Sequence, residues 1–171
     1  CAKRIETYWA GAEGRERAFF VRLKGQLAMA VQDYPAAVVA YQDSLAMQRT
    51  LEPQGPNVAL ALNSLAGAEM RLGDFAAAEL HYLEGFQLSK QMNYFKNLAH
   101  LGCNFARLAA RQQKWEEAEA RAREAFVLLE SYQSEDLSAR NCLTLARALA
   151  RQGRPAEGLP YASRAVEIYT R

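Results

Sequence analysis

The chain shows no period-two alternation of apolar and polar residues, as strands require, and instead repeats a helix–turn–helix pattern four times. Each copy is centred on a turn that carries an aromatic residue, except in the last copy. These positions are Tyr34 in QDYPAAVVAY, Phe75 in GDFAAAELHY, Trp115 in KWEEAEARA and Pro155 in GRPAEGLPYA, at intervals of 41, 40 and 40 residues. A fixed period of this size predicts a solenoid in which each unit buries its apolar face against its neighbours.

Every unit is expected to contain a first helix, a short turn and a second helix. The predicted first helices span residues 15–31, 57–72, 97–112 and 137–152. The predicted second helices span residues 35–50, 75–91, 115–131 and 155–170. The connections between units, at 51–57, 91–97 and 132–138, are predicted to be longer and more polar. We expect Asn57 to cap the helix that follows the first of them.

Small residues occupy matched sites in all four units, where two helices would approach closely. The first-helix site holds Gly25, Ala66, Ala106 and Ala146, and the second-helix sites hold Ala37, Ala78, Ala118 and Gly158, then Ser44, Gly85, Ala125 and Ala165. Tyr41 and Tyr82 lie between them and are expected to fill the gap to the next unit. In this arrangement the units resemble the tetratricopeptide repeat.

That resemblance implies an all-α solenoid of antiparallel helix pairs, wound as a right-handed superhelix of about four repeats. A period near 40 rather than 34 is similar to the longer repeats of kinesin light chains and bacterial signalling proteins. We expect one solenoid over 1–171, with repeats at 14–54, 55–95, 96–135 and 136–171. Residues 1–13 are expected to be the end of a preceding second helix, which would make the chain a segment of a longer protein.

Composition excludes some partners. A formal net charge of +2 gives no general attraction to nucleic acid or to anionic membranes, and no run of apolar residues is long enough to span a bilayer. Three cysteines without close pairs suit a reducing, cytoplasmic environment. Cys1 could be the lipidated residue of a bacterial lipoprotein, but we favour a segment boundary because the period continues beyond residue 1.

Candidate chemistry is sparse, so we expect neither an enzyme nor a cofactor or metal site. His81 and His100 lie in different helices without acidic or cysteine partners at ligand spacing, and motifs such as HExxH, CxxC and GxSxG are absent. Cys103 and Cys142 are interpreted as buried apolar residues, with a redox pair as the alternative. Glu116, Glu117 and Glu119 suit the start of a helix, with catalysis by paired carboxylates as the alternative.

Arginines recur in step with the repeats. Arg71, Arg111 and Arg151 occupy one site in three units, and Arg107 and Arg147 lie one turn earlier. Because the resemblance places such first-helix sites on a concave groove, we predict a partner-binding surface there, formed by Arg22, Asn63, Arg71, His100, Asn104, Arg107, Arg111, Arg140, Arg147 and Arg151. The planar guanidinium group of arginine can donate two parallel hydrogen bonds to a carboxylate, which favours an acidic partner. Alternatively, these cations complement helix dipoles or are neutralised within the protein.

Two functions therefore stay open. The first is a protein-interaction scaffold that binds a peptide, acidic in character, or a partner domain. The family's carboxylate clamp for chaperone tails is not expected, because its sites hold Phe19 and Leu23. The second is a sensor or autoinhibitory arm of a larger signalling ATPase, transcription regulator or protease, which would bind other domains of its own polypeptide. Apolar repeat ends also suggest self-association.

Overall fold

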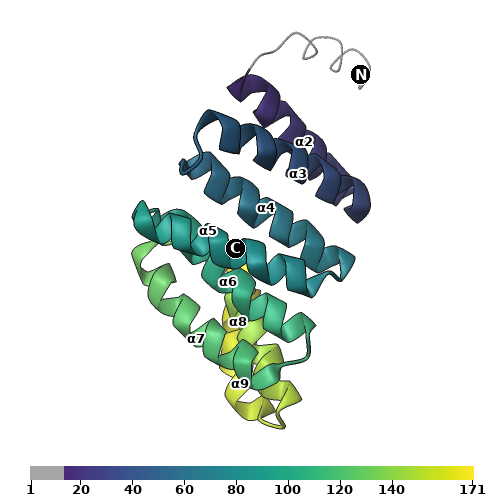
Figure 1. The fold of residues 1–171 in the computed structure, drawn as a ribbon. Coiled ribbons are helices and arrows are strands. Elements are labelled where there is room, and N and C mark those ends of the chain that lie inside the picture. The colour runs from purple at the N-terminus through teal and green to yellow at the C-terminus, as the bar shows by residue number, and fades with distance from the viewer. Residues whose placement is uncertain (1–13) are drawn as a thin grey trace. The chain divides into compact units, whose positions relative to one another are not determined.

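Helices form every regular element in the part of the chain that the structure describes. This computed structural model describes residues 14–171, except for the side chains at 130 and 131 (Figure 1). The helices are α2 (Arg15–Ala30), α3 (Tyr34–Leu51), α4 (Pro56–Leu72), α5 (Phe75–Gln91), α6 (Phe95–Arg111), α7 (Trp115–Ser131), α8 (Glu135–Arg151) and α9 (Pro155–Tyr169). The all-α prediction is confirmed, and each predicted helix end lies within two residues of the observed one. The expectation for residues 1–13 lies outside the described residues.

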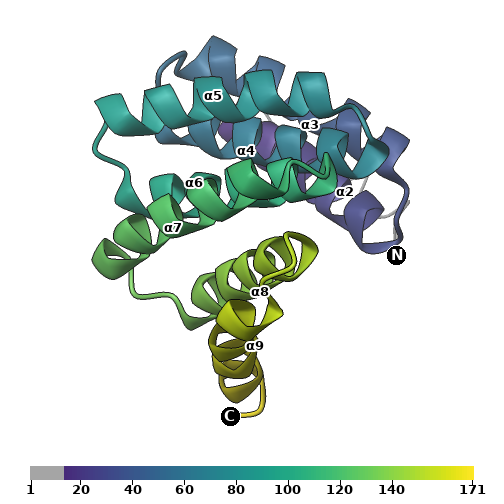
Figure 2. The same ribbon diagram turned by 90° about the horizontal axis from the view of Figure 1, so that it is seen from below.

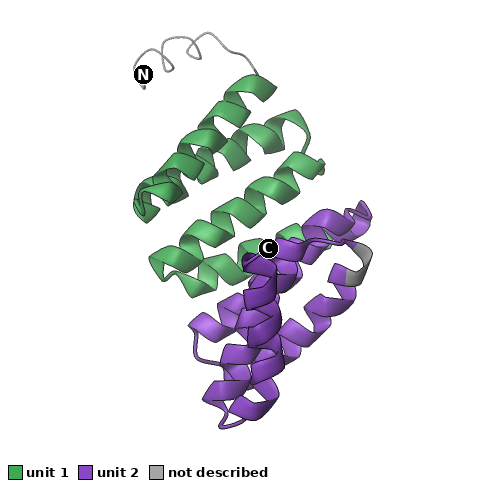
Figure 3. Cartoon of the chain, turned by 180° about the vertical axis from the view of Figure 1, so that it is seen from behind, with its two compact units in different colours: residues 1–88 green, residues 89–171 purple. Residues whose placement is uncertain are grey.

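The chain divides into two compact units, residues 1–88 and 89–171 (Figure 3). In the first unit, α2 packs against α3 and α3 against α4. In the second unit, α6 packs against α7, α7 against α8, and α8 against α9, while α6 also contacts α8 (Figure 2). In the second unit, therefore, the first helix α8 contacts both its own second helix, α9, and the second helix before it, α7.

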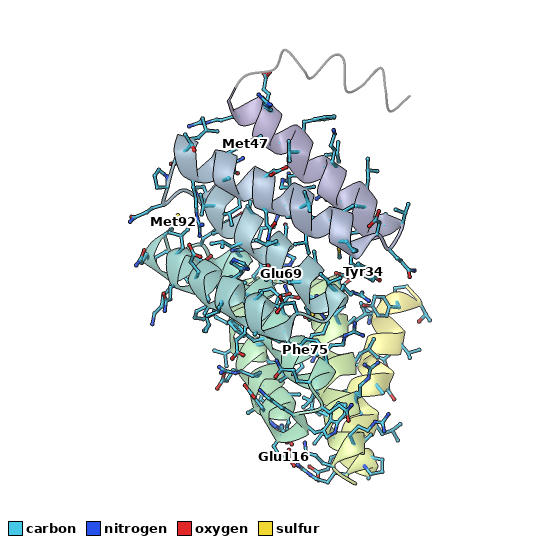
Figure 4. The ribbon with its side chains drawn as sticks, turned by 45° about the vertical axis from the view of Figure 1, so that its right-hand side comes forward. Tyr34, Met47, Glu69, Phe75, Met92 and Glu116 are labelled. Atoms are coloured by element: carbon cyan, nitrogen blue, oxygen red, sulfur yellow. The ribbon has the colours of Figure 1, made fainter. Side chains whose placement is uncertain are left out.

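The turns between the two helices of each pair share one backbone conformation. Each contains a residue in the left-handed region, with φ of 61° at Gln32, 99° at Gly73, 62° at Gln113 and 78° at Gly153. Glycine adopts this conformation without the steric cost that a β-carbon brings. The second helix then begins at the turn aromatic, as Tyr34 and Phe75 show in Figure 4.

The connections between units are shorter than predicted. They comprise residues 52–55, 92–94 and 132–134, rather than seven residues each. The prediction that Asn57 caps α4 is wrong: α4 begins at Pro56, after Gly55, because proline has no N–H that would need a partner in the first turn. Helices α4 to α8 have 17 residues each, so two helices alone equal the 34-residue length of the standard repeat. Long helices, and not long loops, set the period.

The matched small residues explain how the helices approach. A β-carbon added at Gly25 would lie 2.6 Å from Cε1 of Tyr41, whose side chain is buried. Tyr41 thus packs against α2, the first helix of its own repeat. The sequence had predicted only that it fills the gap to the next repeat. In the last pair, a β-carbon at Gly158 would lie 2.9 Å from the carbonyl oxygen of Ala146. Here the backbones of α8 and α9 are in close contact.

A polar network joins α7, α8 and α9, where the fourth unit lacks its turn aromatic. The Glu119 carboxylate accepts hydrogen bonds from Arg123 at 2.8 Å, Gln152 at 2.9 Å and Arg154 at 2.9 Å. Gln152 also donates to the Trp115 carbonyl oxygen at 3.2 Å. These hydrogen bonds lower the pKa of Glu119, and the hydrogen bond from Arg123 has the largest effect. Sequence reasoning assigned Glu119 only to an acidic helix start, and it missed this role.

Candidate functional site

Seven of the ten predicted groove residues lie on α6 and α8, which are neighbouring helices of the second unit. We call this surface the α6–α8 face; it consists of His100, Asn104, Arg107, Arg111, Arg140, Arg147 and Arg151. The buried sides of the same helices position it. Ala106 of α6 and Leu145 and Leu149 of α8 form one apolar cluster with Ala122 of α7. Of the residues of this face, Arg111, Arg147 and Arg151 are exposed, whereas His100, Asn104, Arg107 and Arg140 are half-buried.

Cys103 lies where α6 meets α8, and the neighbouring His100 lies near the connection that precedes α8. The Cys103 thiol lies 4.0 Å from the Leu137 carbonyl oxygen of α8, and the His100 ring lies 6.3 Å from that of Tyr132. Burial lowers the pKa of His100, and the positive charge of Arg140 lowers it further. The imidazole is therefore favoured in its neutral form, in which it can both donate and accept a hydrogen bond.

The arginines of the face differ in what they contact. The Arg140 guanidinium lies 3.7 Å from the Asp136 carboxylate, one helical turn earlier. Arg151 lies over the Trp115 ring, 5.7 Å from its centroid, a cation–π contact that gives this residue a structural role as well. Arg111 and Arg147 are exposed and form no ion pair with any described residue. They are the guanidinium groups best placed to meet an external anion.

The other three predicted groove residues belong to the first unit. Arg22 lies on α2, half-buried, with its guanidinium 5.0 Å from the Phe19 ring centroid. Asn63 and Arg71 lie on α4. Arg22 is also close enough to Tyr41 to oppose the rise in that phenol's pKa, which burial causes. It therefore lies toward the helix interface and is a weaker candidate for contact with a partner.

Nucleophilic or metal chemistry has little support in the geometry. Burial raises the pKa of Cys103 to about 11 and also raises that of Cys142, so both thiols stay protonated near neutral pH. His81 Nδ1 lies 2.7 Å from the buried Glu69 carboxylate, a contact within the fold that is an ion pair when the imidazole is protonated (Glu69 is labelled in Figure 4). In the described part of the chain, no cluster of three His, Cys, Asp or Glu residues is arranged to hold a metal ion.

A separate cavity lies between α7, α8 and α9. Apolar residues Phe126, Leu129 and Ile168 line one part of it, and uncharged polar side chains and side chains of both charges line the rest. Two of these, Arg171 and Glu135, form an ion pair of 3.8 Å. Sequence reasoning did not predict this cavity, because its lining comes from three helices at non-equivalent positions. No described helix is long and apolar enough to cross a bilayer.

Comparison with known proteins identifies the repeats. The sequence profile of the tetratricopeptide repeat family matches residues 19–91, which covers the first two helix pairs. Residues 19–91 therefore match tetratricopeptide repeats. The second unit continues the same helix-pair fold through α9 at the same period. No curated protein sequence matches the chain significantly.

Solved structures share the fold at low sequence identity. A Rap protein complexed with competence and sporulation factor superposes with a TM-score of 0.87 at 14% identity, over 98% of this chain and 47% of that one. BtubC (BKLC) from P. vanneervenii gives 0.75 at 18%, over 90% and 63%. The kinesin light chain-like repeats of a P. anserina protein give 0.70 at 16%, over 98% and 83%. The tetratricopeptide solenoid is confirmed, and the chain spans less than two thirds of the Rap and BtubC chains.

Proposed function

We propose that this chain is a protein-interaction scaffold that binds an acidic peptide, or the acidic surface of a partner domain, on the α6–α8 face. The observation that carries the proposal is the gathering of five arginines on two neighbouring helices. Arg107 and Arg111 lie on α6, and Arg140, Arg147 and Arg151 lie on α8. Like charges on neighbouring helices repel one another, and an anionic partner would relieve that repulsion.

The expected binding mode uses two kinds of group. Guanidinium forks of Arg111 and Arg147 would pair with side-chain carboxylates of the peptide. Asn104 and neutral His100 would hydrogen-bond to its main chain. Since Arg111 and Arg147 are solvent-exposed, each ion pair would add only about 0.2–1 kcal/mol. We therefore expect moderate affinity that falls as salt screens the charges.

The fold comparison supports binding in general terms, because one similar structure is a Rap protein complexed with competence and sporulation factor. A regulatory function is the second candidate. In that case the same face would bind a domain of the same polypeptide, and the chain would be a sensor or autoinhibitory arm. A nucleotide-binding or catalytic domain encoded beside these repeats would favour the regulatory function, whereas further repeats alone would favour the scaffold.

The direct test uses labelled peptides of equal length that differ only in charge, with binding followed by fluorescence anisotropy. The wild-type chain should bind the acidic peptide in preference to the basic one. Arg107→Glu with Arg147→Glu should weaken binding at least about tenfold, because two attractive contacts become repulsive. Arg111→Glu with Arg147→Glu repeats the test on two exposed side chains that the fold does not need.

A matched control changes net charge equally on a different surface. Arg164→Glu with Arg171→Glu reverses two exposed arginines that line the cavity between α7, α8 and α9. This variant should keep the wild-type affinity within about twofold, because short-range pairing and not overall charge sets the binding. Equal losses in the control and the groove variants, at unchanged helicity by circular dichroism, would assign the binding to net charge and refute the site.

A further inference from the structure

Small side chains hold the carboxyl-terminal ends of α6 and α8 together. Ala110 of α6, Ala148 of α8 and the half-buried Trp115 belong to one apolar cluster. Side chains as small as alanine let two helix axes approach to about 8–10 Å. The residues next to these alanines in the sequence, Arg111 and Arg147, therefore lie beside the contact between the helices.

Both arginines lie on the same side of the helix pair. Cys103 contacts Leu137 earlier along both helices than the alanine cluster, so α6 and α8 run in the same direction. Successive residues of a helix are rotated by about 100°. The residue after the contact on α6 and the residue before it on α8 are consequently rotated toward one side of the pair. Arg151 lies one turn further along α8 on that side.

Trp115 holds Arg151 beside the other two arginines. The Arg151 guanidinium lies over the Trp115 ring, 5.7 Å from its centroid, and the same ring packs on the alanine cluster. The face of an aromatic ring attracts a cation, so the ring keeps this guanidinium near the contact of the two helices. We call Arg111, Arg147 and Arg151 the arginine triad; all three residues are exposed.

Acidic side chains of α7 and α9 are paired with other cations. Glu119 and Glu157 both accept hydrogen bonds from Arg154, at 2.9 Å and 2.6 Å. Glu117 lies 3.8 Å from Arg121. Within the part of the chain that the structure describes, no acidic residue forms an ion pair with the arginine triad. Its three positive charges are therefore left for an external anion.

We propose that the arginine triad binds the phosphoryl group of a phosphorylated side chain in the partner peptide. The proposal rests on the function proposed above and names the group for which the α6–α8 face is selective. A phosphoryl group carries a charge of about −1.5 to −2 and three acceptor oxygens, whereas a carboxylate carries one charge and two oxygens. Three guanidinium groups on one side of a helix pair match the phosphoryl group better. Trp115 is a positioning residue, because it acts through Arg151.

Fluorescence anisotropy with three labelled peptides tests the proposal. The peptides share one glutamate-rich sequence and differ at a single central position, which is serine, aspartate or phosphoserine. The wild-type chain should bind the phosphoserine peptide more than about fivefold tighter than the aspartate peptide, because additional charge-assisted hydrogen bonds form. Equal affinity for these two peptides would overturn the proposal and leave the proposed function standing. Failure of all three peptides to bind would refute both.

Single substitutions locate the preference for phosphoserine on the face. Arg111→Gln and Arg151→Gln should each reduce the preference at least about twofold, because one member of the triad is lost. Arg140→Gln is the matched control, since it removes one charge from the same face about three helical turns before Arg151. It should weaken both peptides by a similar factor and leave the preference unchanged. An equal loss of preference in the control, at unchanged helicity, would overturn the assignment to the triad.

Two further measurements test the positioning residue and the source of the phosphoryl group. Trp115→Leu should reduce the preference for phosphoserine, whereas Trp115→Phe should retain most of it, because phenylalanine keeps an aromatic face. Equal weakening of both peptides by Trp115→Leu would overturn the positioning role. Inorganic phosphate should displace the phosphoserine peptide only at more than about tenfold excess, because it lacks the glutamate contacts. Displacement at equal concentration would make the triad a site for free phosphate and overturn the proposal.

Discussion

The close approach of Tyr41 to Gly25 makes a sharp prediction about how a repeat is held together. Gly25→Ala would place a β-carbon 2.6 Å from Cε1 and 2.7 Å from Cδ1 of the Tyr41 ring. The ring is only 4% exposed, so it cannot swing into solvent. To restore an ordinary contact distance, either the ring or α2 has to move by roughly 1 Å.

Two opposing terms set the magnitude. Inserting a methyl group into a tightly packed site typically costs about 1–3 kcal/mol. Replacing a helical glycine by alanine returns about 0.5–1 kcal/mol, because the unfolded chain loses conformational freedom. Gly25→Ala should therefore lower the free energy of unfolding by up to about 2 kcal/mol. Gly67→Ala is the matched control: it lies in α4 of the same unit, and its β-carbon would meet only the Tyr82 hydroxyl at 3.7 Å.

Urea denaturation followed by circular dichroism measures both variants. Gly67→Ala should be slightly stabilised, and the two variants should differ by about 1–3 kcal/mol. In a Tyr41→Leu background the cost of Gly25→Ala should largely disappear, because the ring that causes it is absent. If Gly25→Ala is as stable as Gly67→Ala, the close packing of Tyr41 on α2 does not define the repeat as we argue.

Three further predictions concern individual groups. The hydrogen bond with Glu69 raises the pKa of His81. The stability that protonated His81 contributes should therefore be fully present below pH 6.5 and be lost as pH rises through the folded-state pKa. A difference in unfolding free energy between wild type and His81→Gln that does not change across that pH range would contradict this. Glu119→Gln should lower the thermal midpoint, because it removes the negative charge to which three side chains donate hydrogen bonds. Glu124→Gln, at a side chain that is 69% exposed, should leave the midpoint unchanged. Equal effects of the two substitutions would refute the network. Cys103, with a pKa of about 11, should react with iodoacetamide only after unfolding, and rapid labelling of the native chain at neutral pH would contradict its burial.

Much of the fold could be predicted because the signals are local and repeated. The turn aromatics and the glycines at 73 and 153 mark helix ends through backbone conformation, which a sequence displays directly. Connection lengths were harder, because Pro56 and Asn57 look equally like loop residues until the first turn of the helix is observed. The longer period is accommodated within the helices, which composition alone could not distinguish from longer loops.

The candidate site could be predicted only in outline. A period of 40 places Arg107 beside Arg147, but it does not reveal that Arg151 packs on Trp115 or that Arg22 lies against Tyr41. The buried Glu69–His81 pair was likewise missed, because a glutamate on a helix is ordinarily exposed. Such contacts depend on side-chain reach between helices, which residue spacing does not encode.

The measurement that tests the central proposal most directly is an amide NMR titration of the 171-residue chain with the acidic peptide. The account predicts shift changes concentrated on α6 and α8, around His100, Asn104, Arg107 and Arg147, and their loss in the Arg107→Glu, Arg147→Glu variant. Changes confined to the cavity between α7, α8 and α9, with those residues unmoved, would contradict it.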